Sequence, residues 1–308
     1  MKADWRGIGR LAARWLPVLV VAGGCVFVVR NVDLRELATS LRLVRVWPLG
    51  LALLFATLGV VARSAYWYVL VNTVTRISLR AMATYTIASY AANTFLPLRG
   101  GEALRVWLLQ RRHEVPVTMS GAIIAIEKTA DVSSLLLLVS PLPWLIPDLP
   151  PFISTALRTL ALFVVGGLIA VAIASRHAVR WKVLAGFNVV KRPTILAAGF
   201  ALVLLAWLLD ISAILSVLLA THVAPSIATA LVVILSVNVA IAVPTTPGAV
   251  GTHELGSTFA LHLVGVPEAQ AIPFALLYHA TQILPTLLFG LPTARVLSKE
   301  VVVSPEPG

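Results

Sequence analysis

The chain has 308 residues, of which 59% are hydrophobic and 12% are charged, and its formal net charge is +11. A soluble domain of this length cannot bury so large an apolar fraction, and the apolar runs are continuous rather than alternating, which excludes a transmembrane β-barrel. Apolar runs recur at roughly the twenty residues that a helix needs to cross a bilayer. The sequence therefore predicts a polytopic all-α membrane protein.

Nine apolar segments are predicted along the chain, at residues 15–29, 47–71, 81–96, 117–140, 152–174, 195–220, 227–243, 249–266 and 269–291. The first follows four basic residues and is interpreted as a retained signal anchor rather than a cleaved signal peptide. The stretch 33–46 has apolar residues at helical spacing and is expected to lie in the membrane interface. Cys25 is the single cysteine, so no internal disulfide is predicted, and lipid attachment at Cys25 stays a minor alternative.

The basic residues between the apolar segments predict which segments cross the membrane. With a cytoplasmic N-terminus, nine simple crossings would place the most basic loop, 176–192, outside, against the positive-inside bias. If 81–96 enters and returns, and 227–266 forms a second re-entrant hairpin, this loop lies inside. Four arginines between residues 30 and 45 still lie outside, which is the remaining misfit. We therefore expect six crossings, two re-entrant elements and cytoplasmic termini, with the basic surplus facing anionic lipids rather than nucleic acid.

Two interruptions of the apolar pattern, at 93–102 and 238–254, resemble each other. Each contains an Asn, then Pro, Gly and Glu, and each is followed by a helix and a Val-Pro pair, at 115–116 and 266–267. The offset is 266 − 115 = 151 residues, about half the chain. Because three crossings per half place the second half's start on the opposite side, we predict two inverted repeats, each with three crossing helices and one re-entrant broken helix. Chance similarity between two Pro-Gly breaks is the alternative.

A single integral membrane domain is accordingly expected over residues 1–308. Repeat one covers about 15–140, repeat two about 152–293, and a short polar tail covers 294–308. The residues expected to permit the breaks are Pro97, Gly100 and Gly101 in the first and Pro244, Pro247, Gly248 and Gly251 in the second. Irregular backbone at membrane depth is tolerated only against protein or a wet cavity, so the breaks predict a cavity.

The first break carries charge at the start of a helix. Gly100 and Gly101 permit a bend, and Glu102 follows in the first helical turn, where a negative charge suits the helix dipole. Arg105 lies one turn further on, so that it can pair with Glu102. Arg99 lies in the break itself, and free backbone N–H groups beside arginines suit a phosphate group. The alternative is a helix cap with a surface ion pair.

Ionisable residues also lie inside apolar segments. Glu127, Lys128 and Asp131 occupy one turn of segment 117–140, which favours a polar cavity lining, with a buried structural ion pair as the alternative. Asp210 lies in the middle of segment 195–220 and can pair with an Arg or Lys of the other half. Arg63 has a similar position, or its long side chain can reach the membrane surface.

The second break carries His253 and Glu254, and His279 follows in the last apolar segment as a further lining residue or a packed neutral histidine. These residues lack the spacing of a zinc site, and the chain contains no HExxH or CxxC motif. No metal, cofactor or catalytic residue is therefore predicted.

Three short motifs occur in one order: Asn93, Pro97, Arg99, Gly101 and Glu102; then Glu127, Lys128 and Asp131; then Pro247, Gly248, Gly251 and Glu254. Together they resemble the flippase-like transmembrane domain of the lysylphosphatidylglycerol synthase/flippase family, from about residue 15 to about residue 297. Members are inner-membrane proteins of bacteria and archaea, and the bifunctional ones add a second membrane region and a soluble aminoacyl-transferase domain. Because this sequence offers no grounds for assigning synthesis, we expect a stand-alone member without enzymatic activity.

The resemblance further implies a flippase that moves a phospholipid or related polar lipid, such as an aminoacyl-phosphatidylglycerol, between leaflets. Membrane lipids, anionic or aminoacylated, are the expected partners, and association into homo-oligomers stays open. Two alternatives remain at this point: a membrane-embedded lipid-modifying enzyme or its accessory subunit, and an ion-coupled transporter of small solutes.

Overall fold

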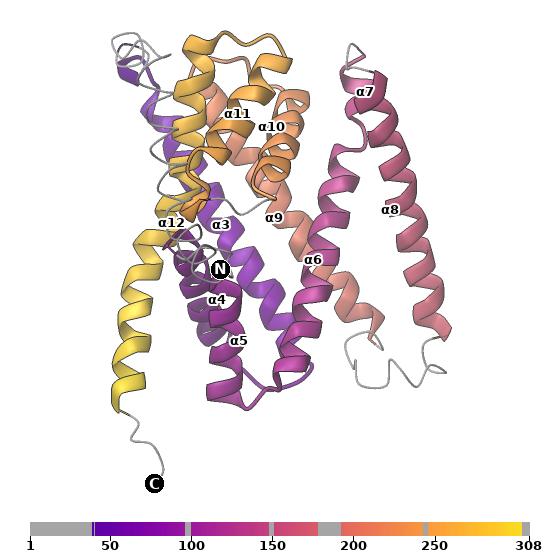
Figure 1. The fold of residues 1–308 in the computed structure, drawn as a ribbon, viewed down its shortest axis with the longest axis vertical. Helices are drawn as coiled ribbons and strands as arrows, with labels where there is room; N and C mark the ends of the chain where they lie inside the picture. The colour runs from indigo at the N-terminus through magenta and orange to yellow at the C-terminus, as the bar shows by residue number, and fades with distance from the viewer. Residues whose placement is uncertain are drawn as a thin grey trace, which may run out of the picture.

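A computed structural model describes residues 39, 41–95, 100–147, 151–177, 192–242 and 246–303. Over these ranges the chain is helical and contains no strand. The elements in order are α3 (Val46–Val71), α4 (Leu79–Phe95), α5 (Gly100–His113), α6 (Val117–Val139), α7 (Leu142–Leu145), α8 (Pro151–His177), α9 (Pro193–Ala220), α10 (Ile227–Ala240), the short 3-10 helix η4 (Pro247–Ala249), α11 (Thr252–Leu263) and α12 (Glu268–Val303) (Figure 1).

The predicted apolar segments after residue 46 are all helices in the structure, and apart from the end of the last one their bounds lie within a few residues of those expected. The last one was expected to end near residue 291, but α12 continues to Val303 and contains Pro273, Pro285 and Pro292. The stretch 294–303 has no glycine or proline to end the helix, which accounts for the difference. Segment 15–29 and most of stretch 33–46 lie outside the described residues.

Several helices have the length and composition to span a bilayer. Among the described residues they are Val46–Val71, Pro193–Ala220 and the Glu268–Gly290 part of α12, and Ile227–Ala240 is a shorter apolar helix. α6 has a similar length but carries three ionisable residues in one turn. Because these helices lie in one bundle and expose many large apolar side chains, the protein is a multi-pass all-α membrane protein.

α3 and α9 pack closely and form the centre of the bundle. A Cβ atom added to Gly59 would lie 3.6 Å from Oδ1 of Asp210, and one added to Gly199 would lie 2.9 Å from the ring of Tyr66. As residue numbers rise along α3, the contacting numbers fall along α9, so the two helices are antiparallel. Small residues allow this close approach, as is usual between membrane helices.

Two short helical hairpins flank the central pair. α4 packs against α5, and α10 packs against α11, and Figure 1 shows these hairpins toward opposite ends of the long axis. Each hairpin has a glycine where the backbones touch. A Cβ on Gly101 would overlap the carbonyl oxygen of Ser89, and a Cβ on Gly256 would lie 2.8 Å from Cα of Val237. The longer helices α12 and α6 then pack against α4 and α10, respectively.

Candidate functional site

The first break is closed by a side chain that precedes it. Oδ1 of Asn93, near the end of α4, accepts a hydrogen bond of 2.8 Å from the backbone N–H of Gly101 in the first turn of α5. Gly100 begins that helix. Arg99 and Pro97, predicted at this break, lie outside the described residues, as does Pro244 of the second break.

Two ion pairs connect α5 with α6. Glu102 accepts a hydrogen bond from Lys128 at 2.7 Å, and Arg105 donates to Glu127 at 3.1 Å. The predicted pair between Glu102 and Arg105 is therefore wrong. Glu127 and Lys128 are adjacent in sequence, so their side chains point in different directions around α6 and meet different residues of α5. Each of these four charges therefore has a partner on the other helix.

The two pairs differ in their contact with the surroundings. The side chains of Arg105 and Glu127 are 1% and 6% exposed, whereas those of Lys128 and Glu102 are 40% and 24% exposed. The guanidinium of Arg105 also lies over the indole ring of Trp67, 3.7 Å from its centroid. Nε and Nη1 of Arg105 have no hydrogen-bond partner among the described residues. A buried arginine with unused donors thus lies behind a more accessible ion pair.

A second charge cluster joins the two halves of the chain. Arg63 of α3 donates to Asp131 of α6 at 2.8 Å and to Asp210 of α9 at 3.3 Å. Its guanidinium lies 4.9 Å from the ring centroid of Trp207. The predicted pairing of Asp210 with a cation from the other half is confirmed. Two carboxylates share one guanidinium here, so removal of Arg63 would leave both without their cation.

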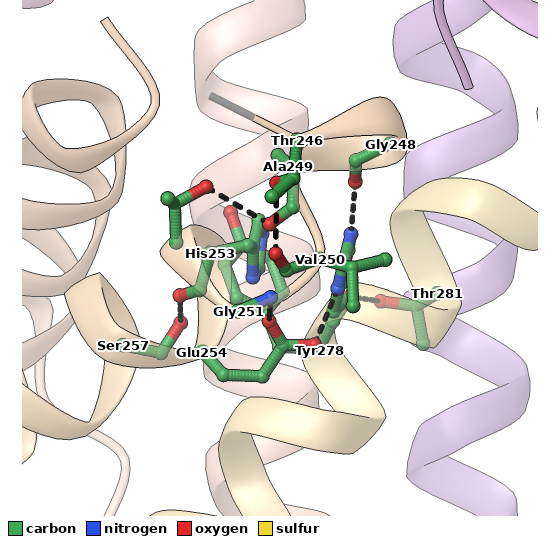
Figure 2. A network of polar contacts seen from close by, with 12 residues as sticks. Thr246, Gly248, Ala249, Val250, Gly251, His253, Glu254, Ser257, Tyr278 and Thr281 are labelled. Carbon is green, nitrogen blue, oxygen red and sulfur yellow. Dashed lines mark hydrogen bonds and ion pairs between the residues drawn. The ribbon is translucent and has the colours of Figure 1, made fainter. Parts of the chain in front are cut away.

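At the second break, Glu254 and His279 are in direct contact. Oε1 of Glu254 lies 2.6 Å from Nδ1 of His279, and Oε2 accepts a 2.7 Å hydrogen bond from the backbone N–H of Gly251. Nε2 of His279 lies 2.8 Å from the carbonyl oxygen of Gly248. Figure 2 shows these contacts around the start of α11. His279 therefore fastens both the turn before α11 and its first helical turn to α12.

His253 lies beside this pair and is 5% exposed. Its ring stacks on that of His279, with centroids 4.3 Å apart and an interplanar angle of 10°, and it lies 4.9 Å from the ring of Tyr278. Nδ1 of His253 has no hydrogen-bond partner among the described residues. The sequence indicated His253 but gave no signal for Tyr278, whose contact arises only from the packing of α11 on α12.

Backbone conformation at the second break favours glycine, although Ala249 also has a positive φ of 57°. Gly248 and Gly251 have φ values of 62° and 86°, which L-amino acids with side chains rarely adopt, and Pro247 begins the 3-10 turn. A Cβ added to Gly248 would lie 3.3 Å from Cγ2 of Thr94, near the end of α4. The second break therefore lies against the helix that leads into the first break.

The acid–base contacts at the two breaks occupy matching places in the sequence. Each has a glutamate in the first turn of the helix after the break and a basic residue on the next helix. The glutamates are 254 − 102 = 152 residues apart, and Lys128 and His279 are 279 − 128 = 151 residues apart. The 151-residue offset of the Val-Pro pairs already matches the polar positions around Lys128 with His279, but the sequence did not indicate that each bonds to the glutamate of its own break.

Comparison with known proteins gives two findings. No curated protein matches the chain. A family model described as the lysylphosphatidylglycerol synthase TM region matches residues 14–290, which include the helices, both breaks and the charge clusters described above. The chain thus belongs to the family of lysylphosphatidylglycerol synthase TM regions.

Proposed function

We propose that this protein is a flippase that moves a polar lipid, of the phospholipid or aminoacyl-phosphatidylglycerol class, between the leaflets of a bacterial or archaeal cytoplasmic membrane, without changing it chemically. Family membership supports a lipid-related role in the membrane. The observation that carries the proposal is the set of charged side chains held inside the helix bundle, beside two broken helices that touch each other. Ionisable groups inside membrane helices are costly and usually serve a passing polar group.

The packing of the helices supports an inverted repeat with two re-entrant hairpins. If α3, α4, α5 and α6 correspond to α9, α10, α11 and α12, respectively, contacts between helices recur in matched pairs. α4–α5 matches α10–α11, and α5–α6 matches α11–α12. Across the halves, α4–α12 matches α10–α6, and α3–α12 matches α9–α6. The central helices α3 and α9, which would be equivalent, pack on each other in antiparallel directions. Broken helices that meet between inverted repeats form the substrate site in many transporters. Six crossings and cytoplasmic termini are part of this proposal.

The charges divide into an accessible and a buried layer, and each suits a different part of a lipid headgroup. Lys128 and Glu102 are partly exposed, so a phosphate can approach the ammonium and an aminoacyl cation can approach the carboxylate. Arg105 lies behind them with unused N–H donors that can bond a phosphate oxygen. In a medium of low dielectric these contacts are much stronger than in water, so a headgroup can leave the aqueous phase while its acyl chains stay in the bilayer.

Leaflet exchange of a headgroup-labelled lipid in proteoliposomes tests the proposal. Vesicles with the wild-type protein should exchange lysyl-phosphatidylglycerol or phosphatidylglycerol faster than protein-free vesicles. Lys128→Ala should reduce that rate several-fold, whereas Arg158→Ala removes a positive charge from the exposed face of α8 and should leave it unchanged. Exchange at the protein-free rate for the lipids tested, or equal rates for both variants, would contradict the proposal.

A further inference from the structure

We propose that Glu254 and His279 form a proton-binding site. While the proton is bound, His279 holds both the turn at Gly248 and the first turn of α11 against α12. When the proton is released, one of these two contacts is lost. The proton site is a property of the break itself. Its use as the coupling ion for lipid movement rests on the proposed function.

The hydrogen-bond geometry fixes the number of protons in the site. The carbonyl oxygen of Gly248 can only accept, so Nε2 of His279 carries a proton and donates to it. Nδ1 is then bonded at 2.6 Å to a carboxylate oxygen of Glu254, which requires one further proton between those two atoms. That proton is either on the imidazole, giving an imidazolium and a carboxylate, or on the carboxyl group, giving two neutral partners.

Loss of the shared proton removes one of the two bonds. If Nε2 keeps its hydrogen, the lone pair of Nδ1 faces a carboxylate lone pair and the contact with Glu254 is lost. If the hydrogen moves to Nδ1, the contact with Glu254 survives, but Nε2 faces the carbonyl oxygen of Gly248 with no hydrogen to donate. In either case the proton goes to water, and the turn at Gly248 or the first turn of α11 is no longer fastened to α12.

Among the residues that the structure describes, no second cation bonds directly to this pair. α10 has no ionisable residue in its sequence. Among the described ionisable side chains, His253 of α11 stacks on His279, and Tyr278 of α12 contacts His253. Further away, Asp210 of α9 and Arg63 of α3 interact electrostatically with Tyr278, and Tyr90 of α4 interacts with Arg63. Arg63 is committed to two carboxylates. His253 stacks flat on the His279 ring, so its nitrogens do not point at the carboxylate.

The first break provides a natural contrast. There the matching glutamate, Glu102, bonds to the partly exposed side chain of Lys128. The same place in the second half holds His279, the side chain type whose ordinary titration lies nearest to neutral pH. The contact at the first break is thus made by a lysine, whereas the contacts at the second break depend on the shared proton. This difference would make the two halves respond differently to pH.

Hydrogen–deuterium exchange of the wild-type protein in lipid nanodiscs tests the site directly. Amide protection of residues 246–254, corrected for the intrinsic pH dependence of exchange, should fall at least about tenfold between about pH 5 and about pH 9, which corresponds to about 1.4 kcal/mol of local stability. Protection of residues 100–106, fastened through Lys128, should not change over the same range. Unchanged protection at 246–254, or an equal fall at 100–106, would overturn the proposal.

Two variants separate the proton from general loosening. His279→Lys places an ammonium that can donate to both Glu254 and Gly248 throughout the pH range of the experiment, so the fall in protection should disappear. Glu254→Gln mimics the neutral carboxyl group, because its amide N–H can donate to Nδ1 of His279 while Nε2–H still donates to Gly248, so protection should not fall as the pH rises. Wild-type pH dependence in either variant would overturn the proposal.

Lipid exchange measured on the same preparations tests the coupling. The rate should depend on pH in the wild type and lose that dependence in His279→Lys, and a pH-independent wild-type rate would overturn the coupling. Absence of any lipid exchange would count against the proposed function instead, while the hydrogen-exchange result would still decide the proton site.

Discussion

Removing the carboxylate of Glu127 should destabilise the protein strongly, because it isolates a buried arginine. The side chains of Arg105 and Glu127 are 1% and 6% exposed, and two of the donor nitrogens of Arg105 have no partner among the described residues even with Glu127 present. In Glu127→Ala the guanidinium loses its carboxylate and keeps its contact with the ring of Trp67. Breaking a buried pair from one side costs about 3–5 kcal/mol. That cost corresponds to roughly a hundred- to several-thousand-fold in the folding equilibrium.

The matched variant is Glu102→Ala, which removes the carboxylate of the neighbouring, more exposed pair. Because Lys128 is 40% exposed and can be hydrated, the expected cost is below about 1 kcal/mol. Unfolding in mixed micelles, followed by tryptophan fluorescence, measures both variants. Equal destabilisation by Glu127→Ala and Glu102→Ala would refute the argument that burial separates the two pairs.

Three further changes should follow the packing described above. Gly101→Ala should prevent the close contact of α5 with the carbonyl oxygen of Ser89 and lower the melting temperature in detergent by several degrees, whereas Gly121→Ala, with no atom within 4 Å of the added Cβ, should not lower it. Arg63→Ala should cost about 3–5 kcal/mol by leaving two carboxylates without a cation, and Arg63→Lys should recover part of that loss in the same unfolding assay. Gly248→Ala should cost about 1–2 kcal/mol, because the residue has a φ of 62°, and should raise amide exchange at the second break.

The helices could be predicted from the sequence because each apolar run is long and ends at polar or helix-breaking residues. The segments after residue 46, apart from the end of the last one, therefore agree with the structure within a few residues. The end of α12 could not be predicted in this way. Its end was expected near residue 291, but Pro292 removes one hydrogen bond without preventing the helix from continuing, and the residues up to Val303 contain no further proline or glycine.

The residues of the site could be predicted, but their partners mostly could not. Glu102, Arg105, Glu127 and Lys128 were each recognised as charges beside or inside a membrane helix. Helical spacing favoured the local pair of Glu102 with Arg105, and only the packing of α5 on α6 shows that each side chain reaches across instead. Local spacing gives the neighbours within one helix, while the choice of partner depends on which face the tertiary contact buries.

Pairing across the repeats was easier to foresee. Asp210 lies deep in an apolar helix, where an unpaired carboxylate is too costly, so a cation from elsewhere was required, and Arg63 is that cation. The correspondence of Lys128 with His279 follows from the repeat offset, but the hydrogen-bond partners of His279 are seen only in the structure. The bonds of His279 to both Gly248 and Glu254 distinguish a histidine that holds two segments together from one that is only packed.

The most direct test of lipid translocation through the charged interior uses a double variant, Arg105→Met with Glu127→Leu. Replacing both members of a buried ion pair by apolar residues is often neutral or stabilising, so this variant should unfold near the wild-type midpoint. The two charges of this buried pair are nevertheless removed from the interior. The account predicts that the folded double variant loses leaflet exchange of headgroup-labelled lipid in proteoliposomes by at least about tenfold, or roughly 1.4 kcal/mol. Exchange at the wild-type rate from a folded double variant would contradict it.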